Sequence, residues 1–136
     1  MDEASPIEND EAVNSDSLRA LSKLVADFVS ERDWEQFHSP KNLAASIAVE
    51  AAELQEIFLW RELDAPIDDK RSEIEREVAD IAICLVNFCN RTEIDLGAAL
   101  RRKLLEAAKK YPVDRVRGRS DKYNEYPEWQ DDNSSN

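Results

Sequence analysis

Two pairs of carboxylates lie within the most apolar stretches of the chain, Glu50 with Glu53 and Glu77 with Asp80. The members of each pair are three residues apart, which puts both on the same face of a helix. Glu50 also shares a helical stripe with Leu54, where a core residue would be expected. Because an ionised carboxylate buried alone costs several kcal/mol, the four acids together predict a bound cation.

A ligand set made only of carboxylate oxygens favours a hard ion, Mg²⁺ or Mn²⁺, over zinc. Mg²⁺ is commonly shared with substrate phosphates, so the pattern favours hydrolytic phosphoryl or nucleotidyl transfer. The alternative is a solvated charged face, because 35% of the residues are charged. We interpret four other acids as surface groups of this kind: Glu56, Glu62, Glu73 and Glu75.

Four helices are predicted to position these residues, each beginning at a side chain that can cap it or at a proline tolerated in the first turn. They run from Asp16 or Ser17 to about Glu31, from Ser39-Pro40 to about Trp60 or Arg61, from Asp68 to about Asn90, and from Asp95 to about Lys110.

The short connection between the second and third helices predicts an antiparallel hairpin. Glu50 lies 11 residues before Arg61, and Glu77 lies 9 residues after Asp68. The two acidic pairs are therefore expected at the same level of the hairpin.

Composition favours one all-α domain. A chain of 136 residues fits a single domain, and with only two glycines it is poor in the tight turns that strands need. Polar and acidic residues dominate both ends, so we expect a domain over residues 16–126 between disordered tails at 1–15 and 127–136.

The net charge of −12 argues against a nucleic-acid or anionic-membrane partner, since both are bound through excess Lys and Arg. No stretch reaches the roughly 18 apolar residues of a membrane span, and the acidic N-terminus lacks the features of a signal peptide. A cytoplasmic location is predicted.

Cys84 and Cys89 point about 140° apart on a helix, which indicates reduced core cysteines.

The motif Glu50-x-x-Glu53, a spacer of 23 residues and Glu77-x-x-Asp80 resembles the signature of the all-α nucleotide pyrophosphohydrolases, the MazG-like superfamily. Residues 32–38, Arg-Asp-Trp-Glu-Gln-Phe-His, are similar to its dCTP pyrophosphatase branch. So are Trp60 and residues 110–113, Lys-Tyr-Pro-Val. The resemblance covers about residues 17–126.

The resemblance implies a four-helix MazG-like bundle that assembles as a homodimer or homotetramer, with active sites at subunit contacts. It implies Mg²⁺-dependent cleavage of a nucleoside triphosphate, most of all dCTP or a modified cytosine nucleotide, to the monophosphate and pyrophosphate. By motif, Glu50, Glu53, Glu77 and Asp80 would be the metal ligands, and Glu53 would also orient or deprotonate the attacking water.

Substrate contacts also follow from the resemblance. A base needs a flat apolar surface with one or two polar groups, and aromatic side chains supply this. Without the resemblance, Trp60 would be interpreted as a core residue at a helix end, and His38 as a loop residue. The residues implied are Trp34, His38 and Trp60 for the base or sugar, and Lys103, Lys110 and Tyr111 for the phosphate side.

Two positions differ from the branch, because Ala107 stands where an Asn is frequent and Cys84 where a Tyr is frequent. Both differences leave the choice among deoxynucleotides open. A di-iron bundle is disfavoured, because it normally needs two Glu-x-x-His pairs and this chain has a single histidine. The remaining alternative is a non-catalytic acidic interaction or regulatory module of the same fold.

Overall fold

The computed structural model describes residues 17–120, and within that range it contains helices and no strand. The all-α prediction with four main helices is confirmed. The predicted tails, residues 1–15 and 127–136, lie outside the described residues. The main helices are α2 (Leu18–Ser30), α3 (Pro40–Phe58), α4 (Arg71–Thr92) and α5 (Leu96–Lys110); the short ones are η2 (Trp34–Phe37), η3 (Asp68–Lys70) and α6 (Val113–Val116).

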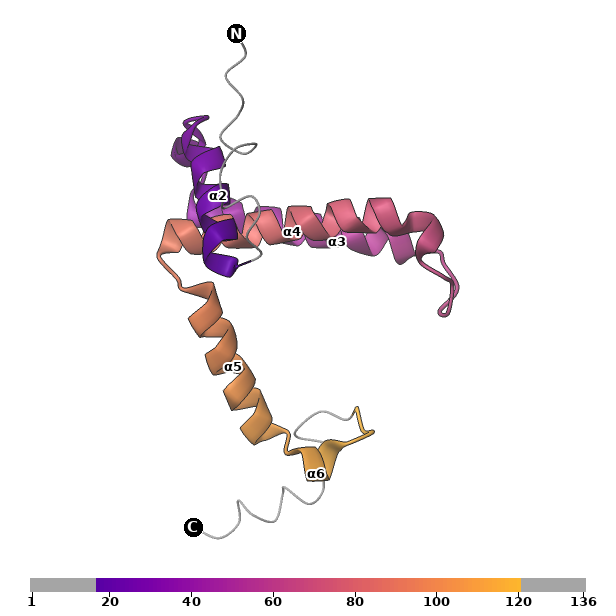
Figure 1. Cartoon of the computed structure of the whole chain (residues 1–136). Coiled ribbons are helices and arrows are strands. Elements are labelled where there is room, and N and C mark those ends of the chain that lie inside the picture. The colour runs from indigo at the N-terminus through magenta and orange to yellow at the C-terminus, as the bar shows by residue number, and fades with distance from the viewer. Residues whose placement is uncertain (1–16, 121–136) are drawn as a thin grey trace. The chain divides into compact units, whose positions relative to one another are not determined.

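The chain divides into two units, one ending at Leu96 and the other beginning at Gly97. In the first unit α3 and α4 lie side by side as the predicted hairpin, and α2 packs against α4 (Figure 1). The amide of Asn90 on α4 donates to the carbonyl of Ser22 on α2 at 2.9 Å, which fixes that crossing. The second unit contains α6 and nearly all of α5.

Serine side chains begin two of the helices as predicted. The Ser17 hydroxyl accepts from the N–H of Ala20 at 3.2 Å, and the Ser39 hydroxyl accepts from the N–H of Asn42 at 3.1 Å. Each bond satisfies one N–H that has no partner within its helix. Pro40 occupies the first turn of α3, where its missing N–H removes no helical bond.

The α3 helix ends at Phe58, before the predicted boundary at Trp60 or Arg61. Its end tightens into three-residue turns, in which the N–H of Arg61 donates to the carbonyl of Phe58 at 3.1 Å. The Arg61 guanidinium donates to both carboxylate oxygens of Asp69, at 3.0 and 2.8 Å, and to the carbonyl of Pro66. This clamp holds the two ends of the hairpin connection together.

The prediction that Asp68 caps the third helix is wrong. Asp68 belongs to the 3-10 turn η3, its side chain makes no cap bond, and α4 begins at Arg71. The reason is a competing partner, because the Asp68 carboxylate accepts from the Arg71 guanidinium at 2.8 Å. At its other end α4 continues to Thr92 and stops where Glu93 takes a left-handed conformation, with φ of 57°.

The most buried apolar side chains of the described chain come from all three helices of the first unit: Val29, Leu43, Val86 and Cys89. Both cysteine thiols are free, as predicted, with Cys84 half-buried.

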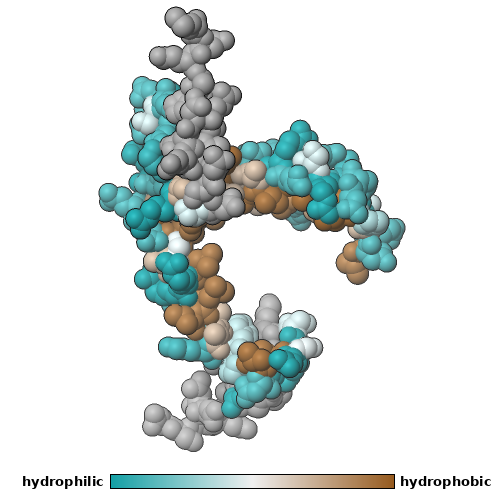
Figure 2. Space-filling model, viewed as in Figure 1, coloured by the Kyte–Doolittle hydropathy of each residue, from teal (hydrophilic) through white to brown (hydrophobic). Residues whose placement is uncertain are grey.

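Apolar side chains are exposed along α5 (Figure 2), where Leu100, Leu104 and Leu105 are each more than half exposed. Within residues 17–120, no helix has the length and apolar character that crossing a membrane requires.

Leu43→Ala is expected to lower the free energy of unfolding by about 2–5 kcal/mol, because it opens a cavity in the core of the first unit. Leu43 is 4% exposed, whereas Leu63 in the hairpin connection is fully exposed. Urea denaturation of both variants measures the effect, with Leu63→Ala expected to change the free energy of unfolding by less than about 0.5 kcal/mol. Equal losses in the two variants would contradict this assignment of the core.

Candidate metal centre

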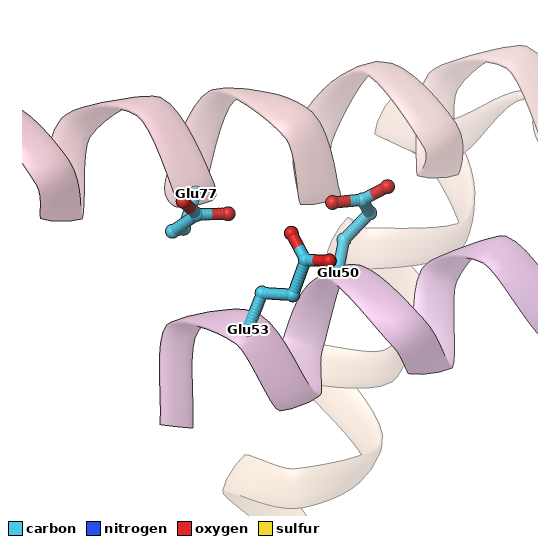
Figure 3. Close-up of side chains that lie close together, drawn as sticks. All are labelled: Glu50, Glu53 and Glu77. Atoms are coloured by element: carbon cyan, nitrogen blue, oxygen red, sulfur yellow. The ribbon is translucent and has the colours of Figure 1, made fainter. Parts of the chain in front are cut away.

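Three of the four predicted metal ligands meet between α3 and α4. Glu50 and Glu53 reach from α3 and Glu77 reaches from α4, so that one carboxylate oxygen of each lies within 4.8 Å of the others. Figure 3 shows the three side chains pointing into the space between the two helices. Glu50 and Glu53 lie on one face of α3 because they are three residues apart, and the antiparallel hairpin places Glu77 opposite them.

Asp80, the fourth predicted ligand, is exposed and lies outside this three-carboxylate cluster. Its charge still acts on the cluster, because it helps to raise the pKa of both Glu50 and Glu77. Asp80 is therefore close enough to interact with the cluster without contributing an oxygen to it.

Two carboxyls of the cluster, those of Glu50 and Glu77, have a pKa above that of an ordinary glutamate. Partial burial raises the pKa of Glu50 most, followed by the negative charges of Glu53, Asp80 and Glu77. Burial likewise raises the pKa of Glu77 most, followed by the charges of Glu53 and Asp80, while Arg76 opposes the shift. Each additional negative charge thus makes ionising the next carboxyl harder.

The side-chain oxygen Oε2 of Glu77 is buried and has no hydrogen-bond partner among the described residues. A buried carboxylate oxygen without a partner costs free energy, and a cation would remove that cost. The ligand set contains only carboxylates, which are ligands that Mg²⁺ and Mn²⁺ accept. The residues of the cluster therefore fit a hard divalent cation.

Beside the cluster lies a cavity of about 410 Å³. Glu56, which is exposed as predicted for a surface group, and Glu73, which is half-buried, both line it. Their spacing carried a signal, since Glu56 follows Glu53 by three residues and Glu73 precedes Glu77 by four, on the same helix faces. The cavity is lined by Glu53, Glu56, Ile57, Lys70, Glu73 and Glu77.

Lys70 is the one cation in that lining, and sequence reasoning missed it. Its ammonium donates to the Glu73 carboxylate at 2.8 Å. No motif singles out Lys70, because its position depends on the 3-10 turn η3 that the sequence did not predict.

The residues predicted to contact the base differ from one another in their surroundings: Trp34 and His38 pack together, and Trp60 is exposed. The Trp34 and His38 rings form a T-shaped pair with centroids 6.4 Å apart. The Trp34 ring forms a second T-shaped pair with Phe28, with centroids 5.8 Å apart. Trp60 follows the end of α3 and is 91% exposed, rather than a core residue of a helix end.

The predicted phosphate contacts belong to the second unit. The Lys103 ammonium lies 3.4 Å from the Glu106 carboxylate, and the Lys110 ammonium lies 5.7 Å from the centre of the Tyr111 ring. The N–H of Tyr111 donates to the carbonyl of Ala107 at 2.8 Å, which extends α5 by one bond.

Comparison with known proteins gives matches in both sequence and structure. A profile of the MazG-like family matches residues 45–126. The dCTP pyrophosphatase 1 of Bos taurus is 36% identical over 116 residues, which are 82% of this chain and 69% of the relative. The Homo sapiens dCTP pyrophosphatase 1 is 35% identical over the same length, covering 82% and 68%. The crystal structure of a pyrophosphatase from Archaeoglobus fulgidus superposes with a TM-score of 0.66 and 36% identity, covering 70% of this chain and 92% of that one.

Without divalent cations, the melting temperature is expected to rise as the pH is lowered from neutral toward 4.5, the ordinary pKa of a glutamate. The raised pKa values of Glu50 and Glu77 mean that the folded chain binds more protons than the unfolded chain in this range, so acid favours the folded state. Mg²⁺ is expected to raise the melting temperature at the upper end of the range and to lose this effect at the lower end, because protons compete for the ligands.

Scanning fluorimetry across this pH range measures both effects. Glu77→Gln should flatten the pH dependence and weaken the Mg²⁺ response, whereas Glu75→Gln removes the same charge from an exposed position of α4 and should leave both unchanged. The same loss in the two variants would indicate a general effect of net charge instead of a metal centre.

Proposed function

The chain belongs to the MazG-like family, and from this premise we propose that this pyrophosphatase hydrolyses a nucleoside triphosphate, most of all dCTP or a modified cytosine nucleotide. The products would be the nucleoside monophosphate and pyrophosphate, and the biological role would be to clear unwanted nucleotides from the pool. The proposed location is the cytosol, in keeping with two free cysteine thiols.

The observation that carries this proposal is the juxtaposition of the three-carboxylate cluster with the cavity. Glu53 and Glu77 belong to both. A triphosphate and a group of carboxylates repel each other, so this cavity suits phosphates only when a cation lies between them. Mg²⁺ held by Glu50, Glu53 and Glu77, with Asp80 alongside, would supply that charge and polarise the phosphate oxygens.

Glu53 is our proposed catalytic residue. It stands on α3 between Glu50 and the opposing Glu77, and it is the member of the cluster on α3 that also faces the cavity. A carboxylate in that position can accept a hydrogen bond from a water molecule and orient it for in-line attack on the α-phosphorus. Breaking the α–β bridge then releases pyrophosphate.

For the nucleoside, we propose the aromatic side chains Trp34, His38 and Trp60. Two of them already form a ring contact, and the third is exposed enough to stack on a base. The preference for cytosine is supported by the names of the relatives with about 36% identity. Ala107 and Cys84, which differ from the branch, make related deoxynucleotides the next candidates.

The decisive experiment incubates the purified chain and Mg²⁺ with a panel of ribo- and deoxynucleoside triphosphates and resolves the products. We expect monophosphate plus pyrophosphate, fastest from dCTP. Glu53→Gln should reduce kcat by at least about 100-fold while leaving helicity intact, because a catalytic carboxylate is lost. Glu62→Gln removes the same charge from the exposed hairpin connection and should retain activity.

Phosphate or nucleoside diphosphate among the products would refute cleavage between the α and β phosphates. If another nucleotide is hydrolysed and dCTP is not, the proposed reaction stands and the proposed substrate is wrong. If no nucleotide is hydrolysed, the chain is better explained as a non-catalytic interaction module.

We also propose a homodimer or homotetramer. The exposed leucines of α5, Leu100, Leu104 and Leu105, form an apolar surface of a kind that soluble chains normally cover. Light scattering coupled to size exclusion should give a mass of two or four chains, and Leu104→Glu should shift the mass downward. A monomeric mass for the unaltered chain would overturn this proposal.

A further inference from the structure

Asn87 is a polar residue in an apolar setting. It is 8% exposed, and within residues 17–120 it is the one polar side chain buried as deeply as the core. It lies on α4 next to Val86 and near Cys89, which are the other buried residues of that helix. Asn is a poor helix former, and burying an amide is unfavourable unless it is hydrogen-bonded. Its partner therefore indicates what it does.

That partner is the ring of His38. The Asn87 amide nitrogen lies 3.0 Å from His38 Nδ1. An amide nitrogen donates and does not accept, so Nδ1 must be the acceptor and cannot carry a hydrogen. In the neutral ring the proton then resides on Nε2.

The same helix also holds the backbone of His38. The Nε of Arg91, one turn after Asn87, donates to the His38 carbonyl at 3.2 Å. The N–H of His38 donates to the carbonyl of Glu35 at 3.1 Å, and the His38 and Trp34 rings form a T-shaped pair. Two successive turns of α4 thus fix both the backbone and the ring of a residue that is far away in sequence.

We infer that Asn87 is a positioning residue, which locks His38 in the Nε2–H tautomer and so makes it a hydrogen-bond donor to the nucleotide. This inference rests on the proposed function for the ligand, but its tautomer part concerns the protein alone. A donor at Nε2 recognises an acceptor, which on a nucleotide is a base carbonyl, an unprotonated ring nitrogen or a sugar oxygen. A ligand that presents a donor at that place would leave the His38 N–H unpaired.

The first test is spectroscopic and uses the full chain. Because the sequence contains one histidine, a long-range ¹H–¹⁵N spectrum of the neutral imidazole reports on His38 alone. We expect Nε2 to be protonated and Nδ1 unprotonated in the unaltered protein. A proton on Nδ1, or an equal mixture of tautomers, would overturn the inference without any variant.

Asn87→Asp reverses the polarity of the contact, because a carboxylate only accepts. It is expected to move the ring proton to Nδ1. Asn90→Asp is the matched control, since Asn90 is an Asn on the same helix whose bond goes to Ser22 and not to His38. The control should keep the Nε2–H form, and a tautomer change in both variants would contradict a specific role for Asn87.

The second test is kinetic. Asn87→Ala is expected to raise KM by about three- to tenfold, the effect of one neutral hydrogen bond, with kcat nearly unchanged. Asn90→Ala should leave KM unaltered. An unchanged KM in Asn87→Ala would overturn the substrate part of the inference.

The two failures can be told apart. If the unaltered chain hydrolyses no nucleotide, the proposed function fails, and the spectrum still decides whether Asn87 sets the tautomer. If hydrolysis proceeds while His38 carries its proton on Nδ1, the role of Asn87 fails and the proposed function stands.

Discussion

Repulsion among like charges is the constraint on which the rest of the first unit depends. Glu50, Glu53 and Glu77 converge between α3 and α4, and burial and mutual charge raise the pKa of Glu50 and Glu77. A fold that holds carboxylates together must supply rigid helices on both sides. The Arg61 clamp and the buried core around Leu43 meet this requirement from opposite ends of the hairpin.

Sequence reasoning predicted the elements that follow from local periodicity. Spacing of three residues and a short connection were enough to expect the acidic pairs at one level, and the caps at Ser17 and Ser39 follow from local chemistry. Sequence reasoning was wrong where a side chain has more than one possible hydrogen-bonding partner nearby. Asp68 bonds Arg71 instead of capping a helix. The role of Asp80 as a metal ligand stays a prediction: its oxygens are not among those that converge, although its charge raises the pKa of Glu50 and Glu77.

Contacts between segments far apart in the chain could not be predicted from the sequence for a different reason. Asn87 and His38 are 49 residues apart, and neither belongs to a periodic pattern that would pair them. Lys70 reaches the cavity only because a 3-10 turn precedes α4. Such contacts depend on how α2, η2 and α4 pack, and local propensities carry no information on that packing.

The Arg61 clamp fixes the start of the hairpin connection to its second half, at Pro66 and Asp69, and leaves residues 62–65 outside these bonds. Arg61 and Asp69 set the separation of α3 and α4 where the chain leaves one helix and approaches the other, whereas Leu63 between them is fully exposed. Loop closure becomes only slowly less favourable with length, so residues can be added between the clamped positions at little cost. During divergence of such chains, the length of this loop is free to drift while the alignment of the carboxylates across the hairpin is preserved.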